Sequence, residues 1–300
     1  AEYLNKWAIS YKDDIINNIM PFWMKYGLDK EHGGVYTCVN RDGSLMDTTK
    51  SVWFQGRFGF IAAYAYNNIE KNPQWLAASK SCIDFIEAHC FDTDGHMFFE
   101  VTEDGVPLRK RRYVFSEGFA AIAMAEYSLA TGEKEYAEKA LEIFKRTQHF
   151  LDTPGMLEPK YLPAMSSRGH SITMILINTA SRIRMVIDDP VLTEQIDASI
   201  AALRKYFIHP EFKALLEMVG PNGEFIDTCN GRVINPGHCI ETAWFIMEEA
   251  KYRNWDKDLL QLALQILDWS WEWGWDKEFG GIINFCLLYT SPSPRDYAAS

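Results

Sequence analysis

The sequence predicts an all-α protein in which helix pairs form an α/α toroid. Apolar helices alternate with amphipathic ones along most of the chain. Short strand-like segments with Gly and Asp turns separate the pairs, roughly every 60 residues, as in repeat architectures. One loop also recurs, as DKEHGGV at 29–35 and DKEFGGI at 276–282. Inner helices this apolar need to be enclosed, so a closed ring covered by outer helices is favoured over an open solenoid.

The N-terminal part of the chain sets this pattern. Residues 2–20 carry apolar side chains at helical spacing, and the helix is expected to end near Pro21. Residues 51–70 are apolar on nearly all sides, which predicts an inner helix. Residues 74–90 are amphipathic, which predicts an outer helix packed against it.

The same alternation continues to residue 273. Residues 114–130 are apolar and rich in small side chains, whereas residues 134–150 are charged on one face. Two further pairs follow, at 171–187 with 191–207 and at 238–253 with 256–273. The strand-like segments between the pairs lie at 33–47, 95–108, 217–227 and 280–285. The first two predict hairpins with Asp-Gly turns.

The end of the chain departs from the pattern. No helix is predicted after Phe285, and SPSPRD at 291–296 is typical of a disordered segment. We therefore expect residues 1–286 to form a single barrel domain that is incomplete at its C-terminus. Residues 287–300 are expected to be a non-native tail.

Composition excludes several classes of protein. Of 300 residues, 47% are apolar and 24% charged, which is typical of a globular chain. A net charge of −11 argues against nucleic-acid binding, and no apolar run reaches the ~18 residues of a membrane span. None of the six cysteines forms C-x-x-C or a zinc-finger spacing, so a cytoplasmic protein is expected. Ten tryptophans fit either a core or a sugar site.

The sharpest candidate for chemistry is the segment NPGHCIETAW at 235–244. Asn-Pro-Gly predicts a turn, and a helix begins near His238. Spacing of three places His238, Glu241 and Trp244 on one broad face. A histidine near a helix N-terminus tends to stay neutral, so His238 can accept a proton while Glu241 orients it. The alternative is a capping histidine with an ordinary partner. A metal site is not expected, because His-x-x-Glu supplies only two ligands.

Three further side chains stand out on apolar helices. Arg57 lies among aromatic residues and is expected to need a partner, either a sugar oxygen, a developing oxyanion or a buried acid. Glu117 is either that structural partner or a substrate ligand. His170 opens another inner helix, where it either faces the same cavity or acts as a cap or core residue.

Several segments together resemble the N-acylglucosamine 2-epimerase family, which also includes cellobiose 2-epimerases and mannose-type isomerases. They are DKEHGGVYTCVNRDG, KSVWFQGR, FSEGFAAIAMAE, NPGHCIETAW and GWDKEFGGI. The resemblance runs from about residue 5 to Phe285. RGHSITMILIN is also similar to a family segment, with His170 and Thr173 as departures.

The resemblance implies an (α/α)6 barrel and inversion at C2 of an open-chain aldose. It implies that His238 is one of two acid/base histidines and that Arg57 and Glu241 also belong to the catalytic site. Residues expected to bind substrate are Trp244, Glu117, Trp53, Tyr36 and His170. The family's second histidine follows the last hairpin, where this sequence diverges, so we expect this chain alone to be inactive or nearly so.

The leading function is therefore interconversion of N-acetylglucosamine and N-acetylmannosamine without a metal or redox cofactor. By resemblance, ATP is a candidate activator and a homodimer a candidate assembly. Three alternatives remain. One is an epimerase or isomerase of unsubstituted sugars. Another is a glycoside hydrolase using Glu117 and Glu241. The last is a non-catalytic sugar- or partner-binding toroid.

Overall fold

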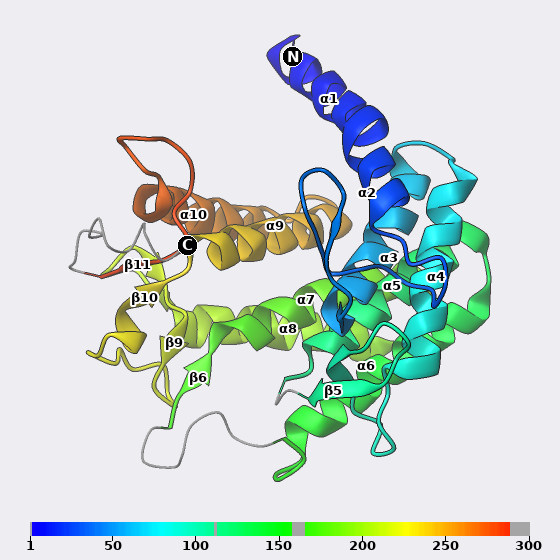
Figure 1. Cartoon of the computed structure of the whole chain (residues 1–300). Coiled ribbons are helices and arrows are strands. Elements are labelled where there is room, and N and C mark those ends of the chain that lie inside the picture. Colours follow the sequence, from blue (N-terminus) through cyan, green and yellow to red (C-terminus); the bar gives the residue numbers. More distant parts are fainter. Residues whose placement is uncertain (1, 111–112, 158–165, 289–300) are drawn as a thin grey trace. The chain divides into compact units, whose positions relative to one another are not determined.

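A computed structural model describes residues 2–110, 113–157 and 166–288 (Figure 1). Most of these residues are helical and the strands are short, so the predicted all-α class is confirmed. The chain divides into two compact units, which are described separately. Unit 1 comprises Ala1–Glu158 with Arg182–Asp188, and unit 2 comprises Pro159–Ser181 with Asp189–Ser300. No helix in the described part of the chain is long and apolar enough to cross a membrane.

Unit 1 begins with an interrupted helix that continues past the predicted end. Helix α1 (Glu2–Asp14) passes through a π-helical turn, Ile15–Ile19, into α2 (Met20–Tyr26). Pro21 therefore lies inside the helical run. Proline lacks an N–H and clashes with the carbonyl four residues earlier, so it usually ends a helix. Here the preceding turn is widened, with the N–H of Met20 donating to the carbonyl of Ile15.

Helices α3 to α6 of unit 1 follow the predicted pairs. Their bounds are Val52–Asn68, Pro73–His89, Phe115–Thr131 and Lys134–Asp152. Helix α3 packs against α4 and α5, and α5 packs against α6. Every residue of α5 from Ser116 to Ser128 is buried, as expected for an inner helix. Gly56 allows α3 to approach α5 closely, because a Cβ there would lie 2.6 Å from the backbone of Phe119.

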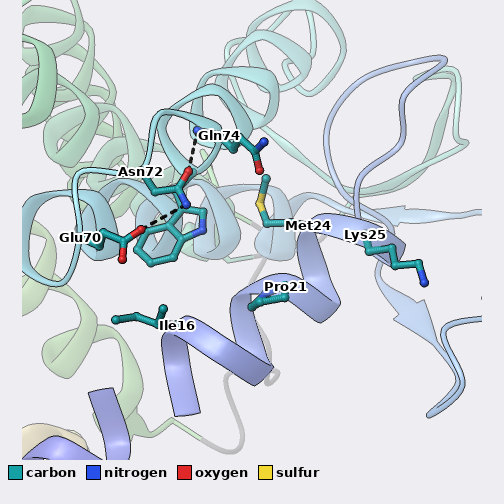
Figure 2. A pocket seen from close by; sticks show the side chains of 8 residues that line it. Ile16, Pro21, Met24, Lys25, Glu70, Asn72 and Gln74 are labelled. Carbon is teal, nitrogen blue, oxygen red and sulfur yellow. Dashed lines mark hydrogen bonds between the residues drawn. The ribbon is translucent and has the colours of Figure 1, made fainter. Parts of the chain in front are cut away.

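A pocket of 340 Å³ lies beside α2 in unit 1 (Figure 2). Its lining combines Ile16, Pro21 and Met24 with polar side chains near the start of α4. Asn72 caps α4 by accepting from the N–H of Gln74 and also donates to Glu70. Asn72 and Glu70 in the pocket wall are therefore already hydrogen-bonded within the turn that precedes α4.

Short strands complete unit 1. The elements are β1 (Cys38–Val39), β2 (Leu45–Asp47), β3 (Lys50–Ser51), β4 (Phe98–Val101) and β5 (Pro107–Lys110). Strand β1 pairs with β2, and the second sheet has the order β3-β4-β5, all antiparallel. The Asp-Gly turns predicted for the first two hairpins are confirmed, since Gly43 and Gly105 have φ values of 85° and 93°.

Replacing Gly105 with alanine is expected to lower the free energy of unfolding by about 2 kcal/mol. The left-handed φ strains any residue with a Cβ, and at Gly105 that atom would also overlap the His89 ring. Gly132→Ala is the matched control, because Gly132 has φ 79° and no atom within 4 Å of an added Cβ. Urea denaturation of both variants checks this. Equal losses would show that packing against His89 contributes nothing.

Unit 2 contains helices α7 to α10. Their bounds are His170–Arg184, Pro190–Ala202, Pro236–Tyr252 and Lys257–Gly274, and the last three residues of α7 fall in unit 1. Helices α9 and α10 pack side by side (Figure 1). A π-helical turn, Leu203–Phe207, extends α8, and a 3-10 turn, Asn230–Arg232, precedes α9.

The strands of unit 2 pair differently from the prediction. They are β6 (Arg168–Gly169), β7 (Ile208–His209), β8 (Ala214–Leu215), β9 (Met218–Val219), β10 (Val233–Ile234) and β11 (Cys286–Leu287). The segment 217–227 does not close on itself, since β9 pairs with β6. β11 pairs with β10, so Leu287 belongs to the fold although the predicted tail began there. Residues 289–300 of that tail lie outside the described residues.

The recurring loop noted in the sequence has the same geometry in both units. In each copy an Asp carboxylate accepts from the N–H groups two and three residues later, as at Asp29 and Asp276. Each loop is closed by an isolated antiparallel bridge, Leu28 with Val35 and Trp275 with Ile282. The similarity of sequence therefore reflects a structural repeat.

Candidate active site

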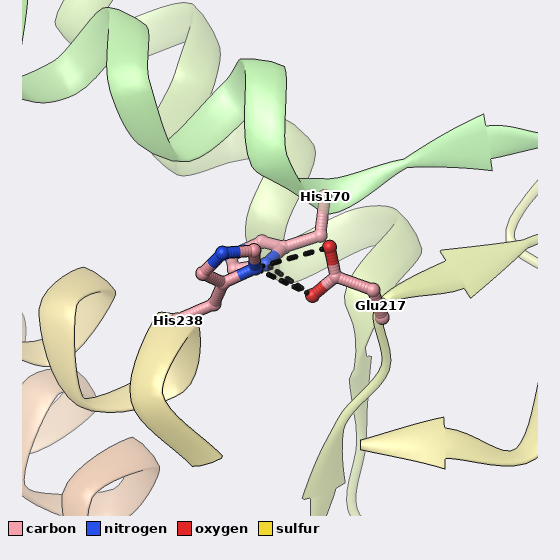
Figure 3. Close-up of side chains that lie close together, drawn as sticks. All are labelled: His170, Glu217 and His238. Atoms are coloured by element: carbon pink, nitrogen blue, oxygen red, sulfur yellow. Dashed lines mark hydrogen bonds and ion pairs between the residues drawn. The ribbon is translucent and has the colours of Figure 1, made fainter. Parts of the chain in front are cut away.

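Two histidines and a glutamate converge in unit 2 (Figure 3). His238 Nδ1 lies 3.1 Å from both carboxylate oxygens of Glu217. His170 Nδ1 lies 3.6 Å from Oε2 of the same carboxylate. The His170 side chain is fully buried, whereas that of His238 is 35% exposed and that of Glu217 is 23% exposed. Only part of the cluster is therefore open to a ligand, and that part includes His238.

Backbone contacts bring these residues together. His170 is the first residue of α7, and its N–H donates to the carbonyl of Glu217 at 3.0 Å where β6 pairs with β9. His238 lies in the first turn of α9, whose N-cap Asn235 accepts from the His238 N–H at 3.1 Å. The Asn-Pro-Gly turn thus places the His238 ring at the start of the helix, as the sequence predicted.

Glu217 is held in its charged form. Burial alone would raise its pKa, but the close contacts and charge interactions with His170 and His238 outweigh burial and lower the pKa to about 2. A charged carboxylate opposite Nδ1 favours the His238 tautomer that carries its proton on Nδ1. The lone pair of the neutral ring is then on Nε2, which can accept a proton.

The low pKa of Glu217 predicts a contribution to stability that is lost in acid. An unfolded glutamate protonates near 4.5, above the folded value, so the contribution is complete above about pH 5 and disappears as the pH falls toward 2. We expect Glu217→Gln to cost about 2 to 3 kcal/mol of unfolding free energy at neutral pH, and less at pH 3.

Urea denaturation at pH 7, 5, 4 and 3 measures this difference. The matched control is Glu272→Gln on the exposed face of α10, where the Lys213 amine is 3.7 Å away and both side chains are 63% exposed. That change should cost little at any pH. A cost for Glu217→Gln that stays constant from pH 7 to pH 3 would contradict the ion-paired description of the cluster.

The cluster also has residue types that bind metals. One ligand atom from each of His170, Glu217 and His238 lies within 4.8 Å of the others. Metal binding needs a lone pair on the coordinating nitrogen. In the arrangement described here, both Nδ1 atoms face an ionised carboxylate, which favours protons on these nitrogens. The donor set therefore fits a hydrogen-bonded acid/base cluster better than a metal centre.

Comparisons with known proteins identify the family of the chain. The family model for N-acylglucosamine 2-epimerase (GlcNAc 2-epimerase) matches residues 34–297. The chain belongs to the N-acylglucosamine 2-epimerase family. It is 30% identical to the human N-acylglucosamine 2-epimerase, covering 90% of this chain and 65% of the human one. It is 29% identical to the mouse protein of that name, covering 95% and 69%. The chain thus spans about two thirds of the length of these relatives.

A solved structure supports the fold. Cellobiose 2-epimerase from Bacillus thermoamylovorans superposes with a TM-score of 0.84 at 20% identity, covering 95% of this chain and 77% of that one. The predicted (α/α)6 class is thereby confirmed.

Two of the residues predicted from the resemblance, Glu241 and Trp244, follow His238 on α9. Trp244 is 46% exposed and packs against the Phe245 ring. Glu241 is half-buried, and within the described residues it has no hydrogen bond or ion pair. The expectation that Glu241 orients His238 is therefore wrong in this structure. Glu217 occupies that role, because it lies in the bend between β8 and β9 with its carboxylate 3.1 Å from the His238 ring.

Arg57 and Trp53 lie in unit 1, on the first two turns of α3. Arg57 is exposed, and its guanidinium stacks 4.4 Å from the centre of the Phe119 ring. Of the three partners considered for Arg57, the buried acid does not fit the described residues, since the guanidinium reaches solvent. Trp53 is half-buried in an aromatic group with Phe99, Phe115 and Phe119.

Glu117 and Tyr36 are held by other parts of unit 1. Glu117 is 1% exposed, and its Oε1 accepts from the N–H of Met97 at 2.9 Å and lies 3.6 Å from His96 Nδ1. These contacts fit the structural alternative for Glu117, although its partner is not Arg57. Tyr36 is half-buried. Burial, followed by the charge of Asp29, raises its pKa.

Sequence reasoning missed Glu217. Its signal is a single acidic residue in the apolar run ALLEMV at 214–219. A charge in such a run needs a buried partner, and two histidines supply it.

Proposed function

We propose that this protein interconverts N-acetylglucosamine and N-acetylmannosamine by removing and returning the proton at C2. The observation that carries the proposal is the contact of the partly exposed His238 with the ionised Glu217. Family membership and the human and mouse relatives, both named N-acylglucosamine 2-epimerase, support the choice of substrate.

The chemistry follows from the acidity of a proton alpha to an aldehyde. In the open-chain sugar, His238 Nε2 takes the C2 proton, and the electron pair moves toward the C1 oxygen to give an enediolate. Glu217 stabilises the imidazolium that forms, because the Nδ1–H already points at its carboxylate. The enediolate needs a cation, and the resemblance suggests Arg57 for that task.

Inversion also requires a proton on the opposite face of C2. Among the described residues, the other histidine of the cluster, His170, is fully buried and cannot reach a substrate. We therefore propose that the second acid lies outside the described residues. The resemblance suggests a cytoplasmic enzyme, in which ATP activates and two copies associate. It also suggests that no metal or redox cofactor is required.

The second candidate is a 2-epimerase of unsubstituted sugars. It is favoured by the 29% identity over 160 residues to the cellobiose 2-epimerase of Eubacterium cellulosolvens. A glycoside hydrolase is disfavoured, because the Glu117 carboxylate is buried and bonded to the backbone instead of lining an open site.

Proton NMR of N-acetylmannosamine in D2O tests the proposed function. The chain is compared with a chimera in which residues 1–286 are followed by the C-terminal segment of the human relative. Deuterium at C2 with formation of N-acetylglucosamine in the chimera supports the proposal. Conversion of cellobiose or mannose instead supports the second candidate. Sugar binding without C2 exchange in either protein would support a non-catalytic sugar-binding protein.

A further inference from the structure

His170 occupies a position behind Glu217 that the proposed chemistry does not use. Its side chain is fully buried, and the edge of the Phe207 ring covers it, with ring centres 5.8 Å apart. Its Nε2 is 2.9 Å from Thr242 Oγ1, and its Nδ1 faces the Glu217 carboxylate. A residue placed in this way cannot contact a sugar, so any effect on the reaction passes through Glu217.

The hydrogen bonds of Thr242 determine which nitrogen of His170 carries a proton. The Thr242 hydroxyl donates its hydrogen to the carbonyl of His238 at 2.8 Å, because a carbonyl can only accept. Toward His170, the hydroxyl oxygen can then only accept. The His170 Nε2 must therefore be the donor in the 2.9 Å contact.

The remaining nitrogen of His170 faces a negative charge. In a neutral ring, Nδ1 would carry a lone pair directed at the Glu217 carboxylate 3.6 Å away, which is repulsive. Nδ1 is buried and has no hydrogen-bond partner in the described part of the protein. A proton on Nδ1 turns this repulsion into an ion pair. The contacts of both nitrogens thus favour the imidazolium form.

We propose that His170 is a positioning residue, held by Thr242 as an imidazolium, that shares the Glu217 carboxylate with His238 and thereby makes His238 release its proton more readily. Glu217 has one negative charge for two rings whose centres are 6.5 Å apart. With His170 charged, protonation of His238 places a second cation beside the same carboxylate. The proton that His238 takes from C2 is therefore held less tightly and is released sooner.

Other groups near the cluster do not supply this effect. Burial raises the pKa of the Cys239 thiol on α9, and the charge of Glu217 raises it further, so the thiol stays neutral. Glu241, one turn after His238, is half-buried and has no bond to either ring. From α8 and its extension, the apolar Phe207 ring packs on His170. Within the described residues, His170 is thus the cation that competes with His238 for Glu217.

Thr242→Val tests the proposal while nearly preserving side-chain shape. Without the hydroxyl, His170 can become neutral and place its remaining proton on Nδ1 toward Glu217. Glu217 is then free to stabilise a charged His238, so the NMR titration midpoint of His238 should rise by about one pH unit. Thr242→Ser keeps the hydroxyl, and its midpoint should match that of the parent protein.

Two measurements distinguish this positioning role of His170 from a purely structural one. With ¹⁵N-labelled histidine, both ring nitrogens of His170 should be protonated at pH 7 in the parent and Thr242→Ser proteins, but only one in Thr242→Val. In an active chimera, the acidic limb of the kcat/KM profile should shift together with the His238 midpoint. If Thr242→Val does not fold, His170→Gln replaces it, with the same upward shift expected.

The proposal is overturned if the parent His170 has one protonated nitrogen at pH 7. It is equally overturned if Thr242→Val leaves the His238 midpoint unchanged, or if Thr242→Ser shifts it as far as Thr242→Val does. It rests on the proposed function only for its kinetic consequence. The NMR measurements need no substrate. If the His238 midpoint shifts as expected but the protein does not epimerise, the proposed function is wrong and the positioning role of His170 stands.

Discussion

Replacing His238 with asparagine is expected to reduce C2 proton exchange and epimerisation by about a thousandfold or more. The asparagine amide can still donate to Glu217, but it has no nitrogen able to take a proton at neutral pH. The fold should be retained, because the backbone contact that starts α9 uses the His238 N–H and the Asn235 side chain. Deuterium incorporation at C2, followed by proton NMR in the chimera, measures the loss.

The matched control is His149→Asn on α6. His149 belongs to unit 1 and is exposed, and its ring contacts the hydroxyl of Thr153 at 3.3 Å. This variant should keep the activity of its parent. If His238→Asn exchanges the C2 proton as fast as the control, another group is the base and the proposed mechanism is wrong.

Replacing Lys50 with methionine is expected to lower the free energy of unfolding by about 3 to 5 kcal/mol. Lys50 is fully buried, and its amine donates to Asp29 Oδ2 and to the carbonyls of Gly33 and Glu103, all within 2.8 Å. Methionine fills a similar volume but leaves the Asp29 carboxylate and both carbonyls without this donor. Urea denaturation at pH 7 measures the loss.

Two comparisons isolate the buried charge. Lys213→Met removes an exposed lysine, so it should cost less than about 0.5 kcal/mol. Adding Asp29→Asn to Lys50→Met should restore part of the stability, since it removes the unpaired carboxylate. If the double variant is less stable than Lys50→Met alone, the uncompensated charge is not the main cost.

The same pair adds to the sensitivity of the fold to acid. Burial would raise the pKa of Asp29, but the bonds from Lys50, His32 and Glu31 lower it to about 2. The stabilising contribution is therefore complete above pH 4 and is lost toward pH 2. Glu217 in unit 2 behaves in the same sense, so Asp29 and Glu217 both resist protonation.

The helix pairs could be predicted from sequence because the spacing of apolar residues shows which faces of a helix are buried. Helix α5 is buried along almost its whole length, and the sequence of 114–130 has no polar face that would require exposure. Pro21 misled the prediction, because a widened turn accommodates a proline that would otherwise end the helix. The spacing of apolar residues does not reveal such a turn. The turn differs from an α-helix only in its backbone hydrogen bond, which joins residues five apart instead of four.

The site was only partly predictable for a different reason. His238 could be identified from the Asn-Pro-Gly turn before it and from its position at the start of a helix, because both are features of the local sequence. Its partner Glu217 lies 21 residues earlier, in a segment whose pairing with β6 the sequence did not predict. The roles of Glu241 and Glu217 were therefore confused. For Arg57, a buried ion pair stayed among the alternatives because its helix was treated as buried on all sides.

Helix α1 has a consequence for how the molecule opens. None of its thirteen residues is buried, and the first buried residue of this helical run is Met20, which packs with Ala65 and Trp75. The amides of α1 are thus protected by local bonds alone and can exchange with solvent through fraying, without global unfolding. A protease should likewise cleave there first, leaving a fragment whose cooperative unfolding is nearly that of the whole chain.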